Sequence, residues 1–145
     1  MIDIKLLEQL CLCNGISGDE GNVRNLIINE IKDCADDIKT DNLGNLIVFK
    51  KGKKSAKSKL MVSAHMDEVG LMVTDITSDG YLKFDEVGGI DRRVLPGKRV
   101  CVGRNGLNGV IGVKPIHLTN GDEKTAVPKM NDMYIDIGAE SREDA

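Results

Sequence analysis

The 145-residue sequence is poor in aromatic side chains, with two tyrosines, two phenylalanines and no tryptophan. This argues against surfaces that stack bases or sugars on aromatic rings. The net charge of −3 gives no electrostatic reason to expect nucleic acid or an anionic membrane as a partner. No apolar run approaches the roughly 20 residues that span a bilayer, and the N-terminus lacks the basic flank and apolar core of a signal peptide. We therefore expect a cytoplasmic protein without nucleic-acid or membrane partners.

Two common classes of reactive site are also missing from the sequence. No pair of cysteines has the Cys-x-x-Cys spacing of a zinc knuckle, and in a cytosolic protein the four cysteines are expected to be reduced packing residues. Cys11 and Cys13 form a poor metal pair, because residues i and i+2 of a helix do not face one another. The Gly-x-Ser-x-Gly elbow of serine hydrolases is absent as well.

The first part of the chain has the periodicity of two helices. Apolar residues recur at helical spacing from Leu6 to Leu10, and Asn14-Gly15 then interrupts the pattern. Ser17 and Glu20 have the spacing of a capping box, in which Ser17 is the N-cap and Glu20 binds back to its amide. An amphipathic pattern continues from there, so the second helix is predicted to run to about Cys34.

After residue 40 the pattern becomes that of strands. Leu46 to Phe49 is a β-type run, and Leu60 to Ala64 is a short apolar run typical of a buried strand. Residues 50–59 between them contain six lysines, which favours a solvated loop over a polyanion site. Helices followed by strands, one of them apolar on both faces, predict the start of an α/β sheet.

Short strand candidates separated by glycine-containing turns make up the rest of the chain. This spacing is typical of a small all-β barrel, so we predict a change of domain near residue 70, with segments 1–69 and 70–145. The candidates are Leu71–Ile76, Tyr81–Phe84, Arg99–Val102 and Val110–Val113.

His65 and Asp67 follow the predicted buried strand and are two positions apart, so in extended chain they project to the same side. An imidazole beside a carboxylate suits metal binding, where one group binds the ion and the other orients the ligand. Open α/β sheets also place their sites at the carboxyl ends of strands. A hydrogen-bonded structural pair remains an equal alternative on these residues alone. Glu68 suggests paired acid/base carboxylates, but a simple carboxylate at a strand end is the favoured interpretation.

The longer string from Ser63 to Gly70 resembles the metal motif of the glutamyl aminopeptidase family, which includes the TET and deblocking aminopeptidases. Strings along nearly the whole chain also resemble that family in the right order. They are Gly15–Glu20, Asp41–Asn45, Val87–Asp91, Gly112–His117 and Ile135–Ala139.

The resemblance implies a fold, a cofactor and two residue roles. The fold would be the α/β start of a phosphorylase/hydrolase-like metallopeptidase domain, with an inserted PDZ-like all-β barrel that mediates homo-oligomer assembly. The cofactors would be two divalent ions, Zn or Co, which activate a water for attack on peptide substrates. His65 matches the first metal-ligating histidine, and Asp67 matches the catalytic-site aspartate that supports it.

The sequence departs from the family in what it lacks. The bridging aspartate, the glutamate pair that supplies the general base and a ligand, a further acidic ligand and a last histidine match nothing in this chain. His117 lies in the predicted β segment, and nothing in the sequence makes it a ligand. We therefore expect the N-terminal portion of an aminopeptidase, inactive alone and binding metal weakly or not at all. The alternatives are a non-catalytic oligomerisation or binding module and, with less support, an endoglucanase, for which no carboxylate pair can be placed.

Overall fold

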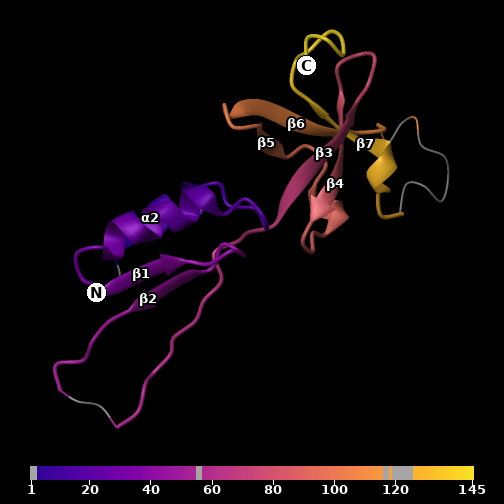
Figure 1. The fold of residues 1–145 in the computed structure, drawn as a ribbon. Coiled ribbons are helices and arrows are strands. Elements are labelled where there is room, and N and C mark those ends of the chain that lie inside the picture. Colours follow the sequence, from indigo (N-terminus) through magenta and orange to yellow (C-terminus); the bar gives the residue numbers. More distant parts are fainter. Residues whose placement is uncertain (1–2, 55–56, 116–117, 119–125) are drawn as a thin grey trace. The chain divides into compact units, whose positions relative to one another are not determined.

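The computed structural model describes residues 3–54, 57–115, 118 and 126–145 (Figure 1). The chain forms two compact units, Met1–Glu68 and Val69–Ala145. The interpretation of segments 1–69 and 70–145 as part of a catalytic domain and an inserted domain remains a prediction. No helix in the described part of the chain is long and apolar enough to cross a membrane.

Both predicted helices are present in the first unit. Helix α1 spans Ile4–Leu12, and the Asp3 carboxylate caps it by accepting hydrogen bonds from the amides of Lys5 and Leu6 at 3.0 and 3.2 Å. Helix α2 spans Gly21–Ile31, three residues shorter than the predicted end near Cys34.

The predicted capping box at the start of α2 is wrong. The N-cap residue of α2 is Glu20, which makes no side-chain cap hydrogen bond. Instead, the Glu20 carboxylate accepts a hydrogen bond from the amide of Gly18 at 2.6 Å, and the Ser17 hydroxyl donates to Asp67. Gly18 has a φ of +92°, so a tight turn precedes the helix, and the Ser17 side chain binds a residue distant in sequence.

The strands of this unit form an antiparallel hairpin. Strand β1, Asp37–Thr40, pairs with β2, Leu46–Phe49, and only β2 was predicted. Arg24 of α2 donates a hydrogen bond from Nη1 to the carbonyl oxygen of Gly44, in the hairpin turn, at 2.5 Å. Among the described residues of Met1–Glu68, Val23 is the only apolar side chain that is buried.

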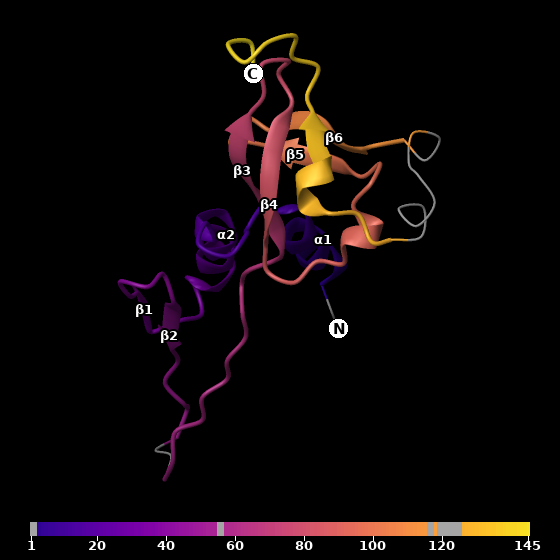
Figure 2. The same cartoon turned by 90° about the vertical axis from the view of Figure 1, so that its right-hand side faces the viewer.

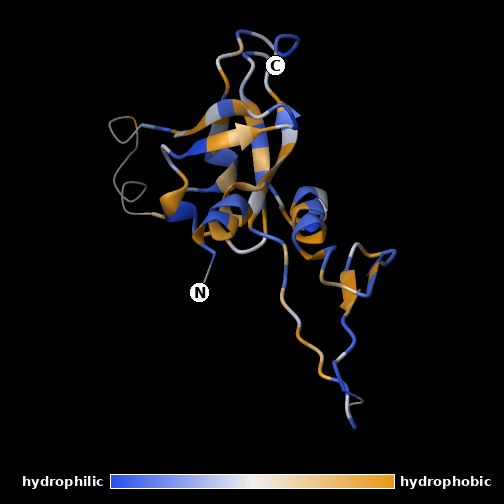
Figure 3. Ribbon diagram, turned by 90° about the vertical axis from the view of Figure 1, so that its left-hand side faces the viewer, coloured by the Kyte–Doolittle hydropathy of each residue, from blue (hydrophilic) through white to orange (hydrophobic). Residues whose placement is uncertain are grey.

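The predicted buried strand at Leu60–Ala64 is also wrong. This run has no secondary structure, and Leu60 is 91% exposed. Figure 3 shows the hydrophobic stretch on the extended segment that follows the lysine-rich loop. A strand requires a hydrogen-bonded neighbour, and among the described residues none pairs with 60–64. The only parallel pairing within the described residues of this unit is a single bridge between Ile16 and Glu68, so these residues form no parallel sheet.

The second unit is a curled antiparallel sheet of five strands in the order β3-β4-β7-β6-β5 (Figure 2). Four of them overlap the predicted strand candidates, and β5 has the predicted bounds. The fifth, β7, was missed, and it lies between β4 and β6. The bounds are β3 Gly70–Ile76, β4 Leu82–Val87, β5 Arg99–Val102, β6 Leu107–Val113 and β7 Met133–Asp136. The fold is therefore a mixed α/β fold, while the PDZ-like barrel remains an expectation.

The core of the second unit lies on one face of this sheet. It includes Met130 of the 3₁₀ helix Met130–Asp132 and Leu95, which directly follows the 3₁₀ helix Arg92–Val94. Met133 and Ile135 of β7 alternate with exposed or half-exposed neighbours, as the period of two in a strand requires. The buried cluster is Leu82, Phe84, Leu95, Ile111, Met130, Met133 and Ile135.

Replacing Gly80 with alanine is expected to destabilise the second unit by about 1–3 kcal/mol. Gly80 has a φ of +81°, and a Cβ there would lie 2.8 Å from the carbonyl oxygen of Ala139. Both the left-handed backbone and this clash with main-chain atoms raise the free energy of the folded state. The loss of stability is measured as faster hydrogen exchange of the β3 and β4 amides. The matched control is Gly89→Ala, because Gly89 has no positive φ and open space at its Cβ. Equal exchange in both variants would contradict the prediction.

Candidate functional site

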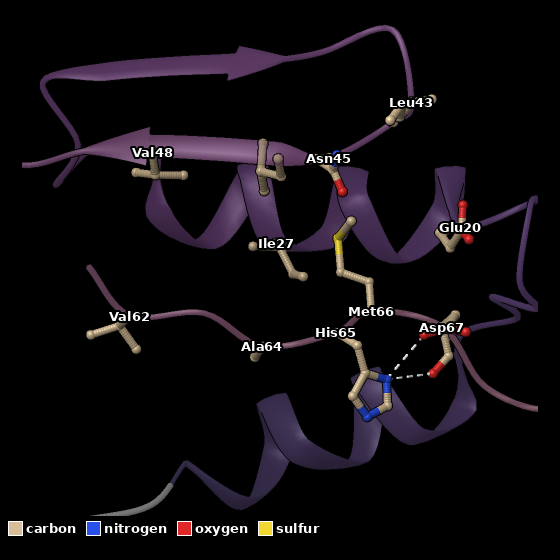
Figure 4. A pocket seen from close by; sticks show the side chains of 12 residues that line it. Glu20, Ile27, Leu43, Asn45, Val48, Val62, Ala64, His65, Met66 and Asp67 are labelled. Atoms are coloured by element: carbon tan, nitrogen blue, oxygen red, sulfur yellow. Dashed lines mark hydrogen bonds and ion pairs between the residues drawn. The ribbon is translucent and has the colours of Figure 1, made fainter.

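His65 and Asp67 lie side by side, as the two-residue spacing predicts. The His65 Nδ1 atom is 3.1 Å from Oδ1 of the Asp67 carboxylate and 3.0 Å from the Asp67 carbonyl oxygen (Figure 4). Figure 4 also shows that the Met66 side chain points towards Asn45, whereas His65 extends to the other side of the segment. The alternation of an extended chain therefore places the two polar side chains together, even without a strand.

This geometry determines which His65 nitrogen is available for a ligand. Both neighbours of Nδ1 are oxygen acceptors, so a neutral His65 ring carries its proton on Nδ1. The lone pair then lies on Nε2, the atom with which a histidine held in this way binds a metal. The His65 side chain is 86% exposed, so Nε2 is accessible from outside this unit.

Asp67 is held by a second contact that the sequence did not reveal. The Ser17 hydroxyl donates a hydrogen bond to Oδ2 of Asp67, across 50 positions of sequence. This bond, and to a smaller degree the contact with His65, lowers the pKa of the Asp67 carboxyl below its usual value. The Asp67 side chain is 39% exposed and is ionised at neutral pH, so it can orient the imidazole as an acceptor.

The turn that carries Ser17 is tied to the same segment through the main chain. The Glu68 amide donates a hydrogen bond to the carbonyl oxygen of Gly15 at 2.8 Å. A Cβ on Gly15 would lie 2.4 Å from Cγ2 of Val23, so only glycine allows this close approach to α2. Ser17, Asp67 and His65 thus form a chain of hydrogen bonds. The segment that carries Ser17 and the segment that carries His65 and Asp67 are also joined by the backbone hydrogen bond between Gly15 and Glu68.

An open groove of about 430 Å³ lies next to this cluster within the first unit. Ile27 of α2 and Val48 of β2 line its apolar part, and Met66 points into it (Figure 4). His65 and Asp67 lie at its edge. The His65 side chain and Met66, which points into the groove, therefore lie on different sides of the same extended segment (Figure 4).

The described residues do not by themselves form a complete metal site. A catalytic zinc ion takes three protein ligands and a water, and the described residues contain no group of three or more His, Cys, Asp or Glu side chains that could hold a metal ion. His65 fits the role of one ligand, with Asp67 as its orienting partner. His117 lies outside the described residues.

Glu68 is held by its backbone. Its backbone amide binds Gly15, and the residue is exposed at the end of the first unit. No hydrogen bond joins its carboxylate to Asp67 among the described residues. The favoured interpretation of Glu68 as a surface carboxylate is consistent with this placement.

A small α/β unit together with a curled antiparallel sheet is similar to the N-terminal part of a TET aminopeptidase. The structure superposes on the TET aminopeptidase of a marine sediment archaeon, Thaumarchaeota archaeon SCGC AB-539-E09, with a TM-score of 0.89 and 35% identity, over 98% of this chain and 40% of that one. The M42 glutamyl aminopeptidase family matches residues 44–145, and this chain belongs to that family.

This chain covers a similar share of two further relatives. The lysyl aminopeptidase of Pyrococcus furiosus is 36% identical over 149 residues, which include 100% of this chain and 42% of that protein. The Pyrococcus horikoshii TET1 peptidase, which assembles into a tetrahedron or a large octahedral shell, superposes with a TM-score of 0.82 and 47% identity, over 98% of this chain and 42% of that one. The chain thus spans about two fifths of the length of these relatives.

Proposed function

We propose that this chain provides the first metal-ligating histidine and its supporting aspartate to the active site of a metal-dependent aminopeptidase. The observation that carries the proposal is the geometry of His65, whose Nδ1 is bound to Asp67 so that Nε2 presents a lone pair. Family membership supplies the reaction class, which is hydrolysis of N-terminal residues from peptides. The remaining ligands and the general base would come from sequence that matches the other three fifths of the relatives.

Two divalent ions, Zn or Co, would supply an activated water and polarise the scissile carbonyl. The contribution of this chain is narrower. Asp67 keeps the proton of His65 on Nδ1 and so leaves the lone pair of Nε2 for the metal ion. The chain alone is expected to be inactive, because one histidine cannot retain a catalytic ion.

We also propose that the protein works in the cytoplasm as a homo-oligomer on peptide substrates. The support comes from the TET assemblies among its structural relatives. An alternative role as a non-catalytic assembly module would rest on the five-stranded sheet alone, and it does not account for the oriented histidine.

A chimera tests the proposed function. This chain would replace the matched segment of the Pyrococcus furiosus lysyl aminopeptidase, and the product would be assayed on a panel of aminoacyl amides. We expect release of N-terminal residues that stops on addition of a chelator and returns with zinc or cobalt. Gel filtration checks assembly of the chimera, and cellulose serves as the control substrate. A folded, assembled chimera that binds two metal ions and releases no amino acid would contradict the proposal.

A further inference from the structure

We propose that Ser17 is a positioning residue for His65, acting through Asp67. It rests on the proposed function, because an oriented Nε2 matters only where a ligand binds it. Nothing in the sequence pattern assigns this role to Ser17, which has the position of a helix cap. In the structure its hydroxyl donates a hydrogen bond to the carboxylate of Asp67, 50 residues away in the sequence.

The argument begins with the two oxygens of Asp67. A carboxylate on a short side chain rotates freely about its last bond unless both oxygens are held. Here Oδ2 accepts the hydroxyl of Ser17 and Oδ1 accepts Nδ1–H of His65 at 3.1 Å. With Oδ2 held, rotation of the carboxylate breaks two hydrogen bonds instead of one. Ser17 therefore keeps Oδ1 directed at the imidazole.

Backbone contacts on both sides hold Ser17 in place. The Asp19 amide donates to the carbonyl oxygen of Ile16 at 2.9 Å, which closes the turn around Ser17. On one side of this turn, Ile16 forms the parallel bridge to Glu68; on the other, Gly18 donates to Glu20 at 2.6 Å. The hydroxyl is thus presented by a turn with contacts on both sides, adjacent to the backbone that follows Asp67.

The consequence concerns the tautomer of His65. An imidazole in water favours the tautomer with its proton on Nε2, which blocks that nitrogen as a ligand. The Asp67 carboxylate reverses the preference by accepting from Nδ1. Loss of the Ser17 hydroxyl leaves the carboxylate free to turn towards water, while the Asp67 carbonyl oxygen remains at 3.0 Å from Nδ1. The expected effect of its loss is therefore a partial return to the Nε2–H tautomer.

Nitrogen-15 NMR of the histidine rings tests this in the 145-residue chain without metal. The spectra are recorded at about pH 8.5, where free imidazole in solution is neutral. We expect the Nδ1–H tautomer to dominate for His65, and Ser17→Ala to shift the tautomer ratio roughly fivefold or more towards Nε2–H. Ser17→Thr retains the hydroxyl and is expected to stay within about twofold of the unsubstituted chain. Asp67→Ala is expected to shift the ratio further than Ser17→Ala.

Two controls separate positioning from loss of structure. Ser63→Ala removes an exposed hydroxyl from the same segment and is expected to leave the His65 signals unchanged. The His117 ring is the internal reference. The proposal is overturned if Ser17→Ala leaves the ratio unchanged, or if Ser17→Thr shifts it as far as alanine does. Since no metal is present, either result is independent of the chimera assay, whose failure would instead count against the proposed aminopeptidase function.

Discussion

Replacement of His65 by alanine in the aminopeptidase chimera is expected to lower kcat/KM by at least about 100-fold. Substitution of a group that merely orients a metal ligand typically costs 10–100-fold in affinity or activity, and His65 is proposed as the ligand itself. Its exposed Nε2 is the ring nitrogen that the Asp67 contacts leave available for a metal. Metal content measured by mass spectrometry of the purified chimera should fall from two ions towards one per chain.

Two matched variants separate the loss of the ligand from other effects of substitution. Asp67→Ala retains the ligand but removes its orienting carboxylate, so a smaller loss of about 10–100-fold is expected. His117→Ala removes the only other histidine and is expected to leave activity within about twofold, because the sequence gives His117 no ligand role. If His65→Ala retained full metal content and activity, the assignment of His65 would be wrong, whatever the reaction of the chimera.

Replacement of Met133 by alanine is expected to destabilise the second unit by about 2–5 kcal/mol. Met133 on β7 is 0% exposed and lies in the cluster formed with Leu82 and Ile111. Truncation loses the transfer free energy of the side chain and leaves a cavity at the centre of the sheet. In hydrogen exchange, the β4 and β6 amides should exchange about 30-fold to a few thousand-fold faster, since each 1.4 kcal/mol corresponds to a factor of ten.

Met72→Ala is the matched control, because Met72 lies on β3 of the same sheet and is 57% exposed. Its effect should remain within about 0.5 kcal/mol. Exchange in α2 should not respond to either substitution, because α2 belongs to the other compact unit. Equal protection losses in Met133→Ala and Met72→Ala would show that the cluster does not hold the sheet together.

Local patterns predicted the strands whose signal is contained in a few adjacent residues. The short β-type runs Leu71–Ile76 and Arg99–Val102 are visible in the sequence, and both lie in strands of the structure. Strand β7 was missed because it has only four residues, too few for its period of two to distinguish it from the neighbouring sequence.

Two other predictions were wrong for a physical reason that they share. The run Leu60–Ala64 has the composition of a buried strand, but composition does not supply the neighbouring strand to which it must bond. Ser17 and Glu20 have the spacing of a capping box, but the helix begins at Gly21 with Glu20 as its N-cap, so Ser17 is not at the cap position and its hydroxyl donates to Asp67 instead. In both places the structure depends on whether a segment distant in the sequence makes a contact, which the neighbouring residues do not show.

The sequence by itself determined the family, the segments that become helices and most strands of the sheet, and the pairing of His65 with Asp67. These properties depend on residue types at short spacing, where the backbone geometry of helix or extended chain is sufficient. Only the tertiary structure decided that Ser17 holds Asp67, that Nε2 of His65 is the available nitrogen, and that β7 lies between β4 and β6. The Ser17 contact and the place of β7 require segments far apart in the chain to meet, and the free nitrogen of His65 follows from side-chain orientations that the sequence does not specify.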